Sequence, residues 1–285
     1  MSAALDRCLA KVARAKVHIH TLDERIQDWR ERDPYALILK PKRDYDWQVH
    51  VTAYVRVVER PPARIWGNVV GDAVQDLRAA LDHLAWELAT KGRRRSVPNP
   101  IPLGDPLRKI QFPILLKQPS DFVATTRAKL DGVTQRAGTR IEKLQPYNGR
   151  EAPPDEHFLW VLSELCNADK HRATNLAAGV PRFWTRQHGE RLRASTLYRR
   201  PPGPLKRQAI LSKLIVKSYG YGANRMRPVS DKAAEDYVKM YLRFAADVVF
   251  DQGAAAANGR EVGHTLRTLE RQVRETLYGF EPYLK

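Results

Sequence analysis

The stretch from Ile65 to Thr90 constrains the fold more than any other part of this chain. It contains no proline, and its C-terminal half is rich in Ala, Leu and Glu, which favour a helix. Its apolar residues recur at steps of three and four positions, the period of one helical face. They are Trp66, Val70, Ala73, Leu77, Leu81, Leu84 and Leu88. We therefore expect a long helix at the centre of the core.

Ionisable residues lie on both flanks of this apolar face. Successive helical residues are about 100° apart, so Arg78 and Asp82 form an i,i+4 pair on one flank. His83 falls on the opposite flank, near Asp72 and Asp76. In an architectural interpretation Arg78–Asp82 is a surface pair, and Asp76 or a backbone carbonyl satisfies His83. In a functional interpretation the same groups belong to a site, and the sequence leaves both open.

Further segments with a helical period predict a bundle of about five helices. The first, from about Ser2 to Arg32, has a nearly heptad stripe and must pack on the central helix or on a second chain. Phe122 to Leu144 predicts one or two helices, Asp155 to Lys170 predicts another, and Arg260 to Leu277 predicts the last.

Residues Trp47 to Val57 alternate apolar and polar side chains without interruption, which predicts a strand with one buried face. Short β-type runs follow at 174–180, 192–198, 208–216 and 237–250, although Asp231 to Leu242 can instead begin as a helix. The expected class is α+β, with the bundle packed against a mainly antiparallel sheet. We expect one domain over 1–285: helix-rich over 1–171 except for the strand at 47–57, strand-rich over 172–252, and closed by a helix at 260–280.

The net charge of +17 is the strongest global signal for a partner. Residues 182–227 contain twelve Lys or Arg and one acid, Glu190, together with several aromatic residues. Basic residues interleaved with aromatics suit a phosphate backbone with unstacked bases, so RNA or DNA is the expected partner. The candidate binding residues are Arg182, Arg199, Arg200, Lys206, Arg207 and Tyr219. The alternative is a solvated basic surface.

A second candidate group forms around Asp169, which continues the apolar stripe of the 155–170 helix inward. A carboxylate there is disfavoured by desolvation and by the helix dipole, so it needs a cation or hydrogen-bond donors. His171 and Arg172 follow directly, and the central helix offers Arg78 and His83. The candidate site residues in this region are therefore Arg78, His83, Asp169 and His171.

Other functional classes lack their motifs. We find no phosphate-cradling glycine loop, no metal-ligand spacing and no CxxC pair, so no cofactor and no metal are expected. Cys8 and Cys166 each fall on an apolar stripe and are expected to be buried thiols in a reduced compartment. No apolar run is long enough to span a membrane and no signal peptide is evident, so a cytoplasmic protein without a membrane partner is expected.

Two motifs carry a family resemblance: LRAALDHLAWELA on the central helix and ELCNADKHR at the end of a later one. Together they resemble an uncharacterised bacterial family known mainly as hypothetical proteins, which implies no established activity. The spacing of Arg78 and His83 also resembles the R-x4-6-H motif of the HEPN superfamily. This chain has Ala79 where that superfamily commonly has a polar residue, and it adds a sheet to the helical bundle.

The HEPN resemblance implies a metal-independent ribonuclease of a toxin or defence type, often working as a homodimer. His83 would then transfer protons and Arg78 would hold the scissile phosphate. The two residues point about 140° apart on a straight helix, so they need a second chain or a second cation from the same chain. The alternative is a non-enzymatic nucleic-acid-binding or regulatory module that uses 182–227. An enzyme acting on a small molecule is a third class.

Overall fold

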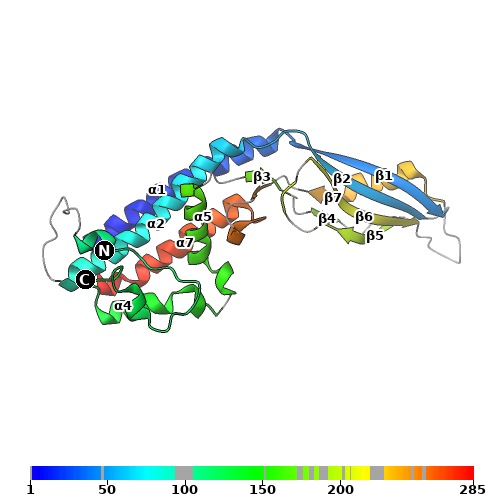
Figure 1. Cartoon of the computed structure of the whole chain (residues 1–285). Coiled ribbons are helices and arrows are strands. Elements are labelled where there is room, and N and C mark those ends of the chain that lie inside the picture. The colour runs from blue at the N-terminus through cyan, green and yellow to red at the C-terminus, as the bar shows by residue number, and fades with distance from the viewer. Residues whose placement is uncertain are drawn as a thin grey trace.

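The computed structural model describes residues 2–45, 48–93, 105–150, 152–171, 176–179, 183–185, 192–200, 203–205, 207–218, 228–244, 247–251 and 255–285. The α+β class and the mainly antiparallel sheet are confirmed. Long helices form one end of the molecule, and a four-stranded sheet projects beyond the other end (Figure 1). Both chain termini lie at the helical end, far from the sheet.

Four helices make the body of the bundle: α1 (Ala3–Glu31), α2 (Ala63–Arg93), α5 (Phe158–His171) and α7 (Val262–Gly279). The shorter helices α3 (Phe122–Thr126) and α4 (Gln135–Lys143) fill the region expected to hold one or two helices. Ser2 caps α1 by accepting a hydrogen bond from the Leu5 amide at 3.3 Å.

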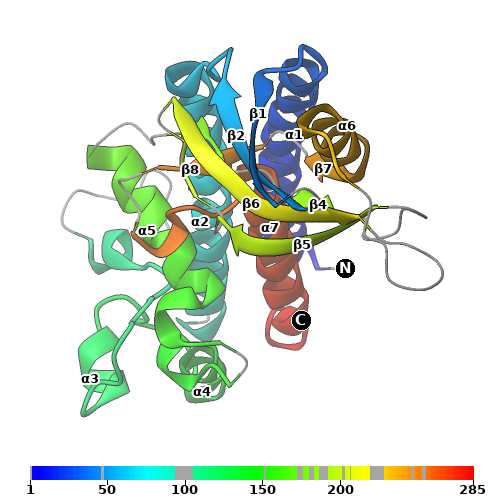
Figure 2. The same cartoon turned by 90° about the vertical axis from the view of Figure 1, so that its right-hand side faces the viewer.

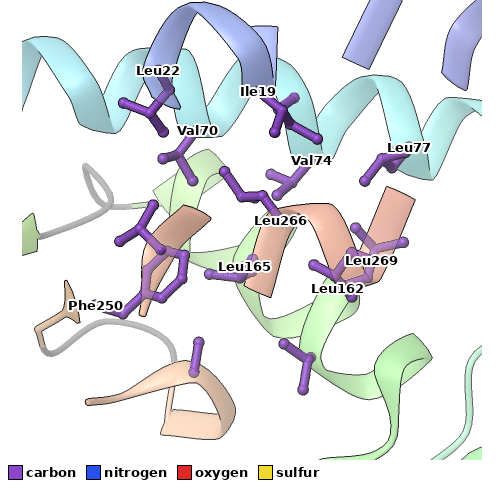
Figure 3. Packing of buried hydrophobic residues seen from close by; sticks show 14 of the residues in the cluster. Ile19, Leu22, Val70, Val74, Leu77, Leu162, Leu165, Phe250, Leu266 and Leu269 are labelled. Atoms are coloured by element: carbon purple, nitrogen blue, oxygen red, sulfur yellow. The ribbon is translucent and has the colours of Figure 1, made fainter. Parts of the chain in front are cut away.

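Helix α2 is the central element, as its apolar face predicts. The buried side of α1 packs along α2. Of the two partners expected for α1, the central helix or a second chain, the structure shows the central helix. Figure 3 shows side chains of α1, α2, α5 and α7 meeting in one apolar cluster, which buries Leu22, Val74, Leu165 and Leu266 almost completely. Such burial contributes about 1.5–3 kcal/mol per large apolar side chain, before the cost of ordering it.

Both cysteines are buried free thiols, as their place on apolar stripes predicts. Burial raises the pKa of Cys8 to about 12 and the pKa of Cys166 to about 12. Thiols with such pKa values stay protonated and unreactive near neutral pH.

The four-stranded sheet has the order β1-β2-β6-β5, and all its pairs are antiparallel. Its strands are β1 (Tyr35–Tyr45), β2 (Gln48–Val57), β6 (Gln208–Ser218) and β5 (Leu192–Arg199). Strand β2 confirms the alternating segment apart from Trp47, which lies outside the described residues. Strand β1 is an addition to the expected sheet. Its Pro41 is tolerated because β1 is an edge strand.

One face of the sheet is covered by α6 (Asp231–Tyr241), which lies along β1 and β2 (Figure 2). The helical alternative for 231–242 is therefore the correct one. Ser230 caps this helix by accepting from the Ala233 amide at 3.0 Å. The remaining strands form two small antiparallel pairs, β3 (Leu176–Ala178) with β8 (Val248–Phe250) and β4 (Phe183–Thr185) with β7 (Leu242–Phe244).

An aromatic cluster joins the bundle to the sheet. The Trp29 ring meets the rings of Tyr35 and Trp66 edge to face, with centroids 5.8 and 6.3 Å away. The Tyr35 hydroxyl donates to the Gly179 carbonyl at 2.9 Å, which fastens the base of β1 to the β3–β8 pair. Burial raises the pKa of Tyr35, so this hydroxyl remains a donor at physiological pH.

Within the described residues, no helix combines the length and the apolar character needed to cross a lipid bilayer.

Candidate nucleic-acid interface

Arg78 and Asp82 form a clamp on the backbone of Phe112. The Arg78 guanidinium contacts the Asp82 carboxylate at 2.9 and 3.2 Å and donates to the Phe112 carbonyl at 2.6 Å. Asp82 in turn accepts from the Phe112 amide at 2.9 Å. The side chain of Arg78 is only 16% exposed. The Arg78–Asp82 pair therefore holds the backbone of Phe112 against the central helix.

His83 lies apart from this clamp. It is exposed on α2, about 140° around the helix from Arg78. Asp76, the neighbour considered for it, instead faces α1, where Arg14, Lys11 and His18 approach its carboxylate at 3.2, 3.6 and 3.7 Å. His83 is thus a solvent-facing side chain rather than a histidine satisfied at the edge of the core.

Asp169 packs against the central helix, as its inward position predicts. Its carboxylate accepts from the Gln75 side-chain amide at 3.2 Å. A Cβ atom on Gly71 would lie 2.1 Å from Asp169 Oδ1, so the Asp169 side chain can hold this position only while residue 71 is a glycine. The donor to this half-buried carboxylate is therefore the Gln75 side chain of α2.

The structure brings Arg78 and Asp169 to the same α2–α5 contact but gives them separate partners. Both act electrostatically on the intervening Cys166 thiol, whose pKa is raised mainly by burial. Asp169 hydrogen-bonds to Gln75, whereas Arg78 bonds to Asp82 and Phe112. The side chain of His171 and all of Arg172 lie outside the described residues.

The predicted binding segment 182–227 is described in part. Arg182, Lys206, Tyr219 and the side chain of Arg199 lie outside the described residues. Arg207 is exposed at the start of β6, and Arg200 is half-buried at the end of β5. The described core of the segment is the β5–β6 pair, which continues the sheet begun by β1 and β2.

The register of the sheet separates two chemically different faces. On β2, Val49, Val51, Ala53 and Val55 are buried on the side that α6 covers. The alternate residues form what we call the open face, and the cross-strand pairs extend it over all four strands. The open face comprises Ile38, Lys40 and Lys42 on β1, Gln48, His50, Thr52, Tyr54 and Arg56 on β2, Ile210, Lys213, Ile215 and Lys217 on β6, and Ser195 and Tyr198 on β5.

The open face is strongly basic. Lys40, Lys42, Arg56, Lys213 and Lys217 are all exposed, and none of them forms an ion pair with an acid in the described part of the chain. The four strands contain a single acidic residue, Asp44. It lies at the far end of β1, where it contacts His50 Nε2 at 3.3 Å and accepts from the Gln48 amide at 3.3 Å. The rest of the face has no described counter-charge.

A separate cleft of about 860 Å³ lies between α5, α7 and β8. Asp247 lines it, and desolvation by burial raises the pKa of this carboxyl to about 6, although Arg30 donates to it at 2.8 Å. His157 lines it too, and burial lowers its pKa. The nearby charges of Arg30 and Glu261 are paired with each other at 3.8 Å.

No family model, curated protein or solved structure matches this chain. Its function therefore has to be argued from its own residues.

Sequence reasoning missed the half of the open face that comes from the N-terminal hairpin. The alternation of Trp47–Val57 predicts that His50, Tyr54 and Arg56 lie on the polar side of a strand, but it does not show that this side joins a binding surface. Strand β1 was hidden by Pro41 and by a run of charged residues, although Tyr35, Leu37 and Leu39 alternate as in a half-buried strand. The sequence feature that could have revealed this half of the face is the set of basic residues on the exposed sides of β1 and β2.

Proposed function

We propose that this protein binds nucleic acid through the open face of its four-stranded sheet. The observation that carries the proposal is the group of exposed cations without a described acidic partner: Lys40, Lys42, Arg56, Lys213 and Lys217. They come from three adjacent strands and lie on one side of the sheet. A surface of one sign raises the local concentration of a polyanion and releases its counterions on binding.

Several cations of the bundle, by contrast, are already neutralised within the chain. Arg7 pairs with Glu87 at 2.7 Å, Arg30 with Asp247 at 2.8 Å and Arg78 with Asp82 at 2.9 Å. These pairs tie helices, strands and connectors of the same chain together. A cation that is already neutralised adds little to the attraction of a phosphate, whereas one without a partner contributes its full charge.

The surrounding sequence adds to the argument. The segment 182–227 carries a net charge of +11, and its described strands lie in this sheet. The proposed partner is thus the RNA or DNA expected from the sequence, and the proposed binding surface includes β1 and β2 as well as the segment 182–227. The ribonuclease implied by the spacing of Arg78 and His83 stays a prediction. Nothing in its geometry favours it over binding, because the Arg78 guanidinium already bonds to Asp82 and Phe112.

Binding of a labelled oligonucleotide at increasing salt tests the proposal. The wild-type chain should bind at low salt, with the logarithm of affinity falling linearly with the logarithm of salt concentration. Replacing Lys40, Lys42, Lys213 and Lys217 by Gln should weaken binding. It should also flatten the slope by about 0.7 for each lysine that contacts a single-strand phosphate.

A matched control removes the same charge from the bundle. Lys16, Arg25, Lys129 and Arg271 are exposed on or beside the helices, and their replacement by Gln should leave the slope close to wild type. Equal losses in the two quadruple variants would mean that net charge alone drives binding. Absence of binding by the wild type at low salt would refute the proposal.

A further inference from the structure

The open face has an apolar and aromatic strip that phosphate contacts do not require. Tyr54 lies on β2, a central strand, and at the same register Ile38 flanks it on β1 and Ile210 on β6. All three are half-buried on the side of the sheet opposite α6. Half-exposed apolar side chains in the middle of a basic surface need a partner with an apolar face. Phosphates lack one, whereas nucleobases have one.

Tyr54 and Tyr198 on the open face each lie beside a lysine. The Lys40 ammonium lies over the Tyr54 ring, 5.2 Å from its centroid. Tyr198 on β5 is 40% exposed and pairs across the strands with Lys213. An aromatic ring with a neighbouring cation can stack on a base while the cation meets the adjoining phosphate.

The two rings are separated by enough distance to meet different bases. Tyr54 and Tyr198 are two strands apart, and Tyr198 lies at the register of Thr52, two residues from Tyr54 along β2. Strand spacing and rise per residue then place them about 12 Å from each other. A duplex keeps its base faces inside its own stack, so it offers these rings nothing to stack on. A single strand can present unstacked bases to both.

From this arrangement we infer that the open face binds single-stranded nucleic acid, with bases stacked on Tyr54 and Tyr198 and phosphates held by Lys40 and Lys213. The inference rests on the proposed function, because it assumes that the basic face is the binding surface. It adds a specific claim: the protein distinguishes single strands from duplexes, and it does so through its tyrosines.

The test compares a single-stranded oligonucleotide and a duplex of the same length, with wild type, Tyr54→Ala and Tyr54→Phe. The wild type should bind the single strand more tightly. Tyr54→Ala should weaken single-strand binding about tenfold, in line with the loss of one stacked base, and should weaken duplex binding much less. Tyr54→Phe, which keeps the ring, should restore single-strand affinity. The circular dichroism and urea unfolding of each variant establish that it is folded.

The outcomes separate this inference from the proposed function. Equal wild-type affinity for both oligonucleotides, unchanged in Tyr54→Ala, would overturn the single-strand inference and leave phosphate binding intact. No wild-type binding to either oligonucleotide would overturn both. Equally strong binding to vesicles of anionic lipid would also overturn both, because the face would then recognise anionic surfaces in general.

Discussion

The central helix and the open sheet face both carry basic residues that the sequence makes prominent, but the structure uses them in opposite ways. On α2, Arg78 is largely buried and its guanidinium bonds to Asp82 and to the Phe112 backbone. On the sheet, Lys213 and Lys217 point away from the covered face, and no described acid neutralises them. The same type of charge holds the fold together in one region and remains available to a partner in the other.

The difference shows that a charged motif has to be judged by its partners rather than by its spacing. The spacing of Arg78 and His83 resembles that of a catalytic motif, yet the partners of Arg78 lie within the chain. The lysines of the open face match no motif, yet together they form the basic surface best suited to a polyanion. An internal ion pair reduces the charge offered to a ligand, so the bundle is expected to contribute to stability and the sheet to binding.

Replacing Arg78 should have the largest effect on stability. Arg78→Ala leaves the Asp82 carboxylate and the Phe112 carbonyl without their common donor in a partly buried site. We expect a loss of about 3 kcal/mol in the free energy of unfolding, measured by urea denaturation. His83→Ala, at an exposed position of the same helix, should change it by less than about 0.5 kcal/mol.

The same two variants also address the ribonuclease prediction. If Arg78 is architectural, RNA should not be cleaved without added metal by wild type or by His83→Ala. Metal-independent cleavage that both substitutions abolish, with Arg78→Ala still folded, would instead favour a catalytic pair and contradict the division between bundle and sheet.

The contact between Gly71 and Asp169 predicts a somewhat smaller effect. Gly71→Ala would place a methyl group against the Asp169 carboxylate, so this side chain must turn away and lose its hydrogen bond to Gln75, at a cost of about 1 kcal/mol in the free energy of unfolding. Gly138 is the matched control, because it lies within α4 and a Cβ there would have nothing within 4 Å. Gly138→Ala should therefore stabilise the protein by about 0.5–1 kcal/mol. Similar effects at both glycines would contradict the contact between Gly71 and Asp169.

Asp247, at the junction of bundle and sheet, predicts a pH dependence of stability. Its pKa is raised to about 6 in the folded protein, so the folded state holds the proton more tightly than the unfolded chain. The stabilisation that comes from tighter proton binding at Asp247 is therefore fully present below about pH 4 and is lost as the pH rises through 6. Asp247→Asn mimics the protonated form. As the pH rises from 4 to 7, the free energy of unfolding of Asp247→Asn should increase relative to that of wild type by on the order of 1 kcal/mol.

Urea denaturation of both proteins across this pH range measures the difference. A difference that stays constant, or that favours wild type as pH rises, would show that the Arg30 pair outweighs desolvation at Asp247.

Much of the fold follows from hydrophobic periodicity. The central helix, the long first helix and the strand after Trp47 are predicted because each has an uninterrupted apolar pattern. Strand β1 was missed because its outer half is polar on both faces, which weakens alternation at an edge strand. The segment 231–242 was ambiguous between strand and helix because short apolar runs fit both periods.

Less of the candidate site follows from the sequence, for a physical reason. A binding surface made from four strands depends on register, and β1 and β6 are brought together only by their separate pairing with β2. The sequence indicates that 182–227 is basic, but it does not show that Lys40 and Lys42 join the same face. The inward position of Asp169 was predictable from the stripe, whereas its partner Gln75 was not.

Lysine footprinting tests the central claim most directly. The full chain is acetylated briefly with and without a bound single-stranded oligonucleotide, and the modification of each lysine is measured by mass spectrometry. We predict that the oligonucleotide protects Lys40, Lys42, Lys213 and Lys217 several-fold and leaves the exposed bundle lysines Lys16, Lys129 and Lys143 unchanged. Protection centred on the bundle lysines, with the sheet lysines unchanged in the complex, would contradict it.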